Sequence, residues 1–228
     1  MIIVKAGTLI DGYSDHPRTD MAVVIEGKKI QKVIPAAELD IPDGVEIIDA
    51  RDKTVLPGMV DCHVHVHTAG GPDDNYSVNA LKEFQGTLAL RAYTYVLKDL
   101  EMGFTALRSL SSPSYVDVAL KKVIQEGSLF GPTLMVSGQG ISVTGGHMDK
   151  AEWSPDVFVG GRTGVGDGPW GCRKAAREQL KRGADLLKIN PCGGSIRNLA
   201  APWHQEMTFE EMAAVIEEAH WAKKKVAA

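Results

Sequence analysis

The hydrophobic pattern divides the chain into two parts. Up to about residue 57, short runs rich in β-branched and apolar residues alternate with the turn sequences DG, EGKK and IPDG. These runs cover residues 2–10, 21–34 and 45–50. No helical period of useful length occurs among them, so residues 1–57 are expected to form a small β-sandwich domain.

From the Leu56-Pro57-Gly58 segment onward, apolar strand-like runs alternate with amphipathic helices. The predicted strands 59–67, 104–110, 132–138 and 185–190 precede predicted helices over residues 79–102, 114–126, 169–182 and 208–224. A capping box starting at Thr208 opens the last helix, and a fifth strand is expected to start at Lys225. Alternating strands and helices of this length predict an α/β fold, either a parallel sheet or an incomplete barrel.

Composition and charge exclude some classes of function. Lys plus Arg is 25 and Asp plus Glu is 29, which gives a formal charge of −4 and argues against binding to nucleic acid or to an anionic membrane. No run of about 20 apolar residues occurs, so no transmembrane span is expected. The three cysteines are irregularly spaced, and the amino terminus lacks a signal-peptide pattern. We therefore expect free thiols and a cytoplasmic location.

The predicted strand 59–67 carries histidines at alternate positions. Alternate side chains of a strand share a face, so His63 and His65 point the same way, about 7 Å apart along the strand. Two such imidazoles can converge on one divalent metal at the carboxyl end of the strand. His67 has the same parity but is expected in the following loop. The alternative is a pair of exposed histidines, which fits poorly with the apolar neighbours that predict burial of this strand.

Lys188 lies near the end of the hydrophobic strand 185–190. A lysine in such a strand is costly to bury unless its charge is lost or paired. Three interpretations remain open at this point: the side chain reaches the surface, it forms a Schiff base, or its neutral amine reacts with CO2 to give a carbamate that bridges two metals. The histidine pair favours the carbamate, because a bridging anion needs metals to bind.

Four segments together resemble the amidohydrolase superfamily: residues 56–65 (LPGMVDCHVH), 102–108 (MGFTALR), 145–147 (GGH) and 183–188 (GADLLK). They are most similar to the imidazolonepropionase-like branch, which includes Xaa-Pro dipeptidases and acyl-amino-acid carboxypeptidases. The resemblance implies a (β/α)8 TIM-type barrel preceded by the small β domain. Such a barrel needs about 250 residues, so residues 58–228 are expected to be its first half, ending in strand 5.

The resemblance also implies a site. His63 and His65 would bind one zinc ion, and carboxylated Lys188, a CO2-derived carbamate, would bridge it to a second. His147 would contact the substrate. The family completes this site with histidines after strands five and six and an aspartate after strand eight, and this sequence contains none of these. We therefore expect the chain to be the front portion of a longer enzyme.

The resulting functional prediction is a zinc-dependent hydrolase. It would cleave an amide or peptide bond of a small substrate, such as a Xaa-Pro dipeptide or an N-acyl amino acid, through a zinc-bound hydroxide. The full-length protein is expected to form a homo-oligomer. Two alternatives are a Schiff-base lyase or aldolase that uses Lys188, and an inactive fragment that needs its missing half.

Four further residues are weaker candidates. Cys192 is expected to be a bystander beside Lys188, and Arg108 is expected in a buried salt bridge. His204 lies in a loop that lines either the pocket or the surface, whereas His220 fits a solvated helix face.

Overall fold

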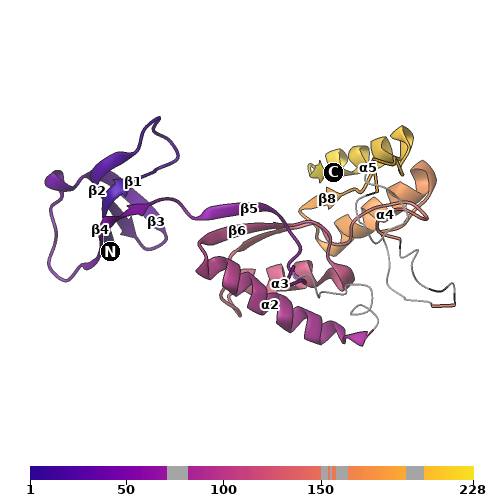
Figure 1. Ribbon diagram of the computed structural model, residues 1–228, viewed down its shortest axis with the longest axis horizontal. Coiled ribbons are helices and arrows are strands. Elements are labelled where there is room, and N and C mark those ends of the chain that lie inside the picture. Colours follow the sequence, from indigo (N-terminus) through magenta and orange to yellow (C-terminus); the bar gives the residue numbers. More distant parts are fainter. Residues whose placement is uncertain (71–81, 150–153, 155, 158–163, 194–202) are drawn as a thin grey trace. The chain divides into compact units, whose positions relative to one another are not determined.

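The fold is described from a computed structural model, shown in Figure 1. It describes residues 1–70, 82–149, 154, 156–157, 164–193 and 203–228. Backbone contacts divide the chain into two compact units, Met1–Gly58 and Met59–Ala228, which are treated separately below.

The first unit is a four-stranded sheet with the strand order β3-β2-β1-β4. Its strands are β1 (Ile2–Leu9), β2 (Arg18–Glu26), β3 (Lys29–Pro35) and β4 (Glu46–Val55), and the short 3-10 helix η1 (Ala36–Glu38) follows β3. Neighbouring strands are antiparallel except β1 and β4, which run parallel. The strand-rich character of this region is confirmed. The unit contains one sheet, packed over a core that includes Ala6, Leu9 and Met21.

The second unit alternates strands and helices along the chain, which confirms the predicted α/β pattern. Its parallel strands are β5 (Met59–Val64), β6 (Phe104–Ser109) and β7 (Thr133–Val136), followed by the parallel pair β8 (Leu186–Lys188) and β9 (Lys225–Ala227). The helices are α2 (Gln85–Glu101), η2 (Pro113–Tyr115), α3 (Val116–Gln125), α4 (Gly168–Arg182) and α5 (Phe209–Trp221). No helix among the described residues is long and apolar enough to cross a membrane.

The helix ends can be compared with the start and stop signals in the sequence. The capping box at Thr208 is formed, because its hydroxyl accepts the Glu211 N–H and the Glu211 carboxylate accepts the Thr208 N–H. Helix α4 ends at Gly183 with φ +98°, a left-handed cap that glycine adopts without steric cost. Helix α2 begins at Gln85, and the predicted helix start at residue 79 lies outside the described residues.

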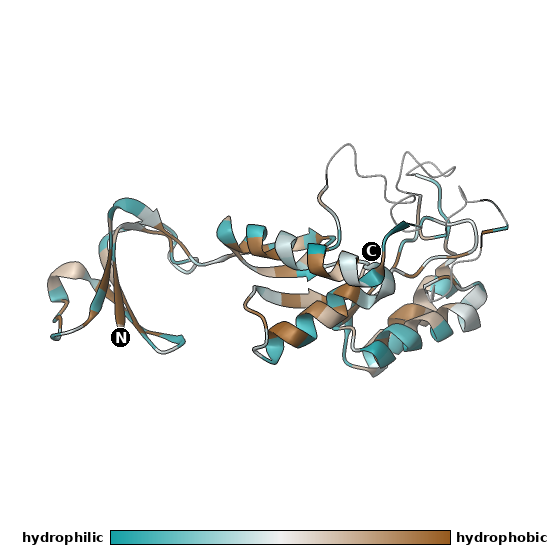
Figure 2. Cartoon of the chain, turned by 90° about the horizontal axis from the view of Figure 1, so that it is seen from below, coloured by the Kyte–Doolittle hydropathy of each residue, from teal (hydrophilic) through white to brown (hydrophobic). Residues whose placement is uncertain are grey.

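The second unit has two hydrophobic clusters. One joins α2 and α3 to β6 and β7 and includes Val96, Leu107 and Val136; the other joins α4 and α5 to β8 and includes Leu187 and Val215. Figure 2 shows the helices carrying both hydrophobic and hydrophilic stretches, as expected for amphipathic helices that cover a sheet.

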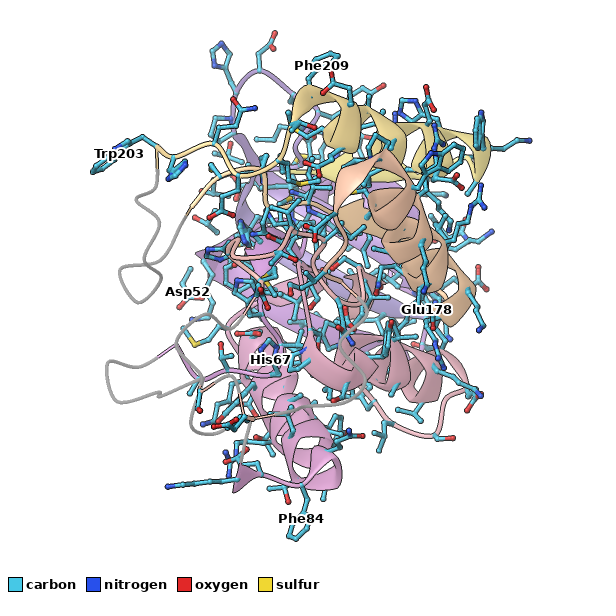
Figure 3. All side chains as sticks on the ribbon, turned by 90° about the vertical axis from the view of Figure 1, so that its right-hand side faces the viewer. Asp52, His67, Phe84, Glu178, Trp203 and Phe209 are labelled. Carbon is cyan, nitrogen blue, oxygen red and sulfur yellow. The ribbon has the colours of Figure 1, made fainter. Side chains whose placement is uncertain are left out.

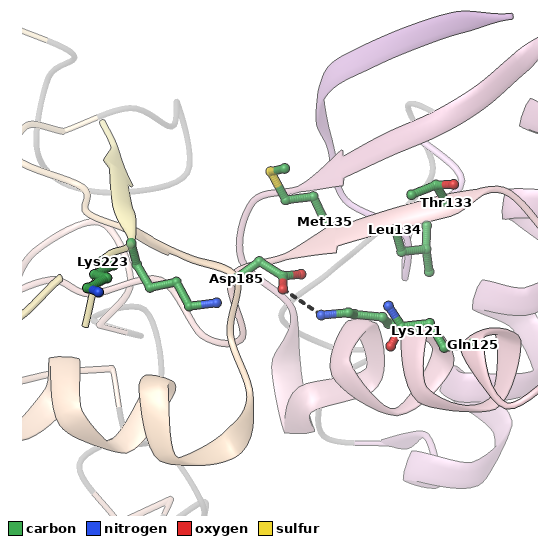
Figure 4. Close-up of a pocket in the computed structure, with 8 residues that line it drawn as sticks. Lys121, Gln125, Thr133, Leu134, Met135, Asp185 and Lys223 are labelled. Carbon is green, nitrogen blue, oxygen red and sulfur yellow. Dashed lines mark hydrogen bonds and ion pairs between the residues drawn. The ribbon is translucent and has the colours of Figure 1, made fainter. Parts of the chain in front are cut away.

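Asp185 joins the two groups of strands. Its backbone N–H donates to the Val136 carbonyl at 2.7 Å, and its carboxylate accepts the Val136 N–H at 3.0 Å. The same carboxylate pairs with the Lys121 ammonium of α3 at 2.5 Å, drawn as the dashed line in Figure 4. Further along, the Ile141 N–H donates to the Lys188 carbonyl at 2.8 Å. The chain after β7 therefore runs beside β8, as the order of strands in a barrel requires.

Replacing Asp185 tests this link. We expect Asp185→Ala to lower the free energy of unfolding by about 1–3 kcal/mol, because the half-buried Lys121 ammonium and the Val136 N–H both lose their acceptor. All four tryptophans belong to the second unit, so their fluorescence in urea reports its unfolding. Asp15→Ala, at an exposed position of the first unit, is the control and should leave this transition unchanged. Equal midpoints for the two variants would contradict the role given to Asp185.

Candidate active site

The histidines of the first barrel strand lie where β5 ends. His63 is within β5, and its N–H donates to the Asp61 carboxylate at 2.9 Å. His65 follows the last residue of the strand, and the ring centroids of His63 and His65 are 5.4 Å apart. The two imidazoles therefore sit together at the carboxyl end of the strand, as the alternation predicts.

The expectation that this strand is buried is wrong for its histidine face. His63 and His65 are exposed, whereas Val64 packs against the cluster around α2 and Val66 is buried in it. β5 is the edge strand of its sheet; Val64 and Val66 pack on the α2 side, whereas the two histidines on the opposite face stay exposed. These neighbouring apolar residues, the partly buried Val64 and the buried Val66, are therefore covered only on the side of the strand that faces α2.

His67 lies beyond the strand and turns inward. It is only 7% exposed, and its ring centroid is 6.1 Å from that of His65. Figure 3 shows His67 among the interior side chains, whereas Phe84 and Trp203 project at the edge of the view. Its loop position agrees with the sequence interpretation.

The surroundings of His65 keep its imidazole neutral. Although the residue as a whole is exposed, the protein around its ring removes part of the solvent, and this desolvation lowers the pKa of His65; the positive charges of His63 and Lys188 lower it further. The carbonyl oxygens of Ser111 and Leu110 oppose this shift, because they favour an N–H donor. A neutral imidazole at pH 7 retains the lone pair that metal binding needs.

Lys188 is the last residue of β8 and is 7% exposed, so its side chain does not reach the surface freely. Burial lowers its pKa; the nearby Cys192 thiol raises it, and the positive charge of Arg108 lowers it. In the described part of the chain no carboxylate pairs with the Lys188 ammonium. Because its charge also acts on His65, the ends of β5 and β8 meet in one electrostatic neighbourhood.

Within the part of the chain that the structure describes, Arg108 does not form the salt bridge expected for it. Its Nε donates instead to the backbone carbonyl of Cys62 at 2.6 Å, which joins β6 to β5 beside the histidines. Cys192, His204 and His220 are exposed. Of these three residues, Cys192 is the one that affects the pKa of Lys188.

His147 lies on the long segment after β7 and is half-buried. Its N–H donates to the Glu206 carboxylate at 2.7 Å. A Cβ at the preceding Gly146 would lie 2.8 Å from the same carboxylate and 2.4 Å from the Ser142 hydroxyl, so a side chain there would clash. Glu206 lies between β8 and α5. Its hydrogen bond with the His147 N–H therefore connects this segment to the one that carries His147.

A buried polar network behind His65 was not anticipated from the sequence. The Ser111 N–H donates to the Ser137 hydroxyl at 2.7 Å, and the Gly140 N–H donates to the Ser111 hydroxyl at 3.1 Å. The fully buried Asp117 carboxylate accepts the N–H groups of Ser137 and Gly138 at 3.2 and 3.1 Å. The serines at the ends of the predicted strands 104–110 and 132–138, Ser111 just beyond the first and Ser137 near the end of the second, are the sequence signal that could have located it.

The cavity in Figure 4 lies elsewhere. It has a volume of about 360 Å³ and is lined by Lys121, Gln125, Thr133, Leu134, Met135, Asp185, Lys223 and Lys224. Thr133 begins β7, Asp185 immediately precedes β8 and Lys224 immediately precedes β9. This cavity is therefore at the amino ends of the strands, whereas His65 and Lys188 are at the carboxyl ends.

The donor set limits how a metal could bind. Among the described residues, no three His, Cys, Asp or Glu side chains come together as a metal site. The two adjacent imidazoles are suitable zinc ligands. Among the described residues, Lys188 would supply a further ligand once its neutral amine becomes an anion by carboxylation. The residues present therefore fit a zinc ion under that condition.

Comparison with known families assigns the chain. The family model described as "Amidohydrolase family" matches residues 54–228. The chain belongs to the amidohydrolase family. This match covers most of the sequence, including β5 to β9, and it confirms the superfamily resemblance.

Individual amidohydrolases are similar over nearly the whole chain. Ochratoxinase from Aspergillus niger is 29% identical over 238 residues, covering 95% of this chain and 47% of that protein. A Xaa-Pro dipeptidase with methionine bound in its active site superposes with a TM-score of 0.87 and 31% identity, covering 99% of this chain and 55% of the other. A prolidase complexed with N-methylphosphonate-L-proline gives a TM-score of 0.84 and 29% identity, with coverage of 99% and 55%.

These amidohydrolases confirm the fold class: the second unit matches part of a TIM-type barrel, and a strand-rich region precedes it. The chain spans about half the length of the relatives it matches.

Asp117 provides a test of the network behind His65. Burial raises the pKa of its carboxyl group from the ordinary 3.8 to about 7. Between these values the folded state binds more protons than the unfolded state, so the Asp117 contribution to stability is present at low pH and is lost as pH rises from about 4 to about 7. Urea titrations followed by tryptophan fluorescence across this range should give a shallower decline for Asp117→Asn than for the wild type. Parallel profiles would contradict burial of a titrating carboxyl group here.

Proposed function

We propose that the protein hydrolyses an amide or peptide C–N bond of a small substrate with the help of zinc. The observation that carries this proposal is the pair of adjacent imidazoles at the carboxyl end of β5 together with the buried Lys188 at the carboxyl end of β8, which has no ion-pair partner among the described residues and whose charge acts on His65. In barrels of this type, active sites form at that end of the strands. When bound, zinc lowers the pKa of water toward neutrality and polarises a carbonyl group.

His63 and His65 would be the first ligands of this zinc. Their rings are 5.4 Å apart, and the lowered pKa of His65 keeps its lone pair available at pH 7. A zinc ion prefers nitrogen and oxygen donors in a tetrahedral arrangement. Two imidazoles from one strand supply half of such a set.

Lys188 would supply the anionic ligand. Burial and the charge of Arg108 lower its pKa and so favour the neutral amine. The Nζ lone pair can form a bond to the carbon of CO2; the nitrogen then loses a proton to solvent and leaves a carbamate of charge −1. This anion would bridge to a second metal in the complete enzyme, with the CO2-derived group acting as part of the cofactor set.

His147 would contact the substrate from the segment after β7. The contact between its N–H and Glu206 holds its backbone in place. One similar structure is a Xaa-Pro dipeptidase, and another is a prolidase complexed with N-methylphosphonate-L-proline. We therefore propose a Xaa-Pro dipeptide or an N-acyl amino acid as the substrate class.

A Schiff-base lyase is the second candidate, because the same lowered pKa of Lys188 is what an amine nucleophile needs. Borohydride added with a carbonyl substrate would label Lys188 in that case. Hydrolysis that stops on chelation and returns with zinc would exclude it. Zinc bound in proportion to the chain without turnover would indicate that this portion alone is inactive.

The ligand assignment predicts the behaviour of two variants. We expect His63→Ala and Lys188→Ala to lower zinc affinity and hydrolysis by more than the roughly 10–100-fold that loss of a supporting hydrogen bond costs. Zinc competition with a chelator is measured on the chain, and hydrolysis of Xaa-Pro dipeptides and N-acyl amino acids on the full-length gene product. With 13C-labelled bicarbonate, a carbamate carbon signal should be present in the wild type and absent in Lys188→Ala.

His220→Ala is the matched control, since His220 is an exposed histidine on α5. It should bind zinc and hydrolyse substrate like the wild type. Unchanged zinc binding in His63→Ala would contradict the proposed site.

A further inference from the structure

Ser111 has an unusual backbone for a residue with a side chain. It follows β6, is 7% exposed and has φ +79°. This left-handed region is sterically unfavourable for residues other than glycine, and such conformations persist where the surroundings hold them in place. The question is therefore what holds Ser111 and what its conformation achieves.

Two groups from the end of β7 hold Ser111. The Ser137 hydroxyl accepts the Ser111 N–H at 2.7 Å, and the Gly140 N–H donates to the Ser111 hydroxyl at 3.1 Å. A Cβ on Gly140 would lie 3.1 Å from that hydroxyl and 2.9 Å from the Asn190 side-chain oxygen, so only glycine permits this close approach. Both the backbone and the side chain of Ser111 are thus fixed by the adjacent strand end.

The third polar group of Ser111 faces His65. Its carbonyl oxygen lies 3.4 Å from Nδ1 of the imidazole, within hydrogen-bonding distance. A carbonyl only accepts, so it favours the tautomer in which Nδ1 carries the hydrogen. Nε2 then holds the lone pair and is the ring atom that can bind a metal.

We propose that Ser111 is a positioning residue: its strained backbone, held by Ser137 and Gly140, presents its carbonyl to His65 and fixes the Nδ1–H tautomer. The proposal rests on the proposed function only in taking zinc as the metal that Nε2 binds. The tautomer itself is a property of the metal-free chain. A merely structural Ser111 would support the fold without setting the ring hydrogen.

The first experiment needs no variant of the network. We expect imidazole 1H–15N spectra of the metal-free chain at pH 8 to show His65 with its hydrogen on Nδ1, the His65 signals being identified by their loss in His65→Gln. An Nε2–H tautomer would overturn the proposal.

The second experiment removes one support. Ser137→Ala takes away the acceptor of the Ser111 N–H, so we expect a mixture of His65 tautomers and zinc affinity lower by about 10–100-fold. Ser109→Ala is the matched control: Ser109 is fully buried on β6, and its hydroxyl has no hydrogen-bond partner in the described residues. This control should change neither the tautomer nor the affinity for zinc.

The two readouts separate the two proposals. If Ser137→Ala changes the tautomer but the wild type binds no zinc, the role of Ser111 stands and the proposed function fails. If Ser137→Ala matches Ser109→Ala in both tautomer and zinc affinity, the role of Ser111 is overturned, whatever the activity of the protein.

Discussion

The contact of Asp185 with Val136 and Lys121 is the constraint on which the candidate site depends. The ladder from β5 through β6 to β7 is continuous, whereas β8 pairs with β9 in a separate two-stranded sheet among the described strands. Asp185 links β7 to β8: its backbone N–H donates to the Val136 carbonyl, and its carboxylate accepts the Val136 N–H. Lys188 follows three residues later in the chain. The position of Asp185 beside β7 therefore fixes where Lys188 lies relative to the histidines.

The electrostatics of the site follow from that placement. Four basic residues lie at the carboxyl ends of the strands: His63, His65, Arg108 and Lys188. Because like charges repel, a positive charge on one of them makes protonation of its neighbours less favourable. Burial acts in the same direction. The imidazole of His65 and the amine of Lys188 are therefore favoured in their neutral forms, which are the forms that bind a metal ion and add to CO2. The proposed chemistry would thus depend on nitrogen bases kept without their protons.

Much of this arrangement could be predicted from the sequence, and the rest could not for physical reasons. Periodicity predicted the strands and helices, and alternation predicted the shared face of His63 and His65. Burial of β5 was mispredicted, because apolar neighbours do not tell which face of an edge strand is covered. The backbone of Ser111 was not predicted, since its φ is set by the distant Ser137 and Gly140.

Membership in the amidohydrolase family indicates that the active site lies at the ends of the strands. It does not indicate the substrate, because loops carry most substrate contacts. In this chain the two relevant segments are not independent. Glu206, before α5, accepts the N–H of His147 and lies where a side chain on Gly146 would be. A change in the segment after β8 would therefore move the backbone of His147 as well. If His147 contacts the substrate as proposed, substrate choice would be a joint property of both segments, and residues far from His147 in sequence would alter what it contacts.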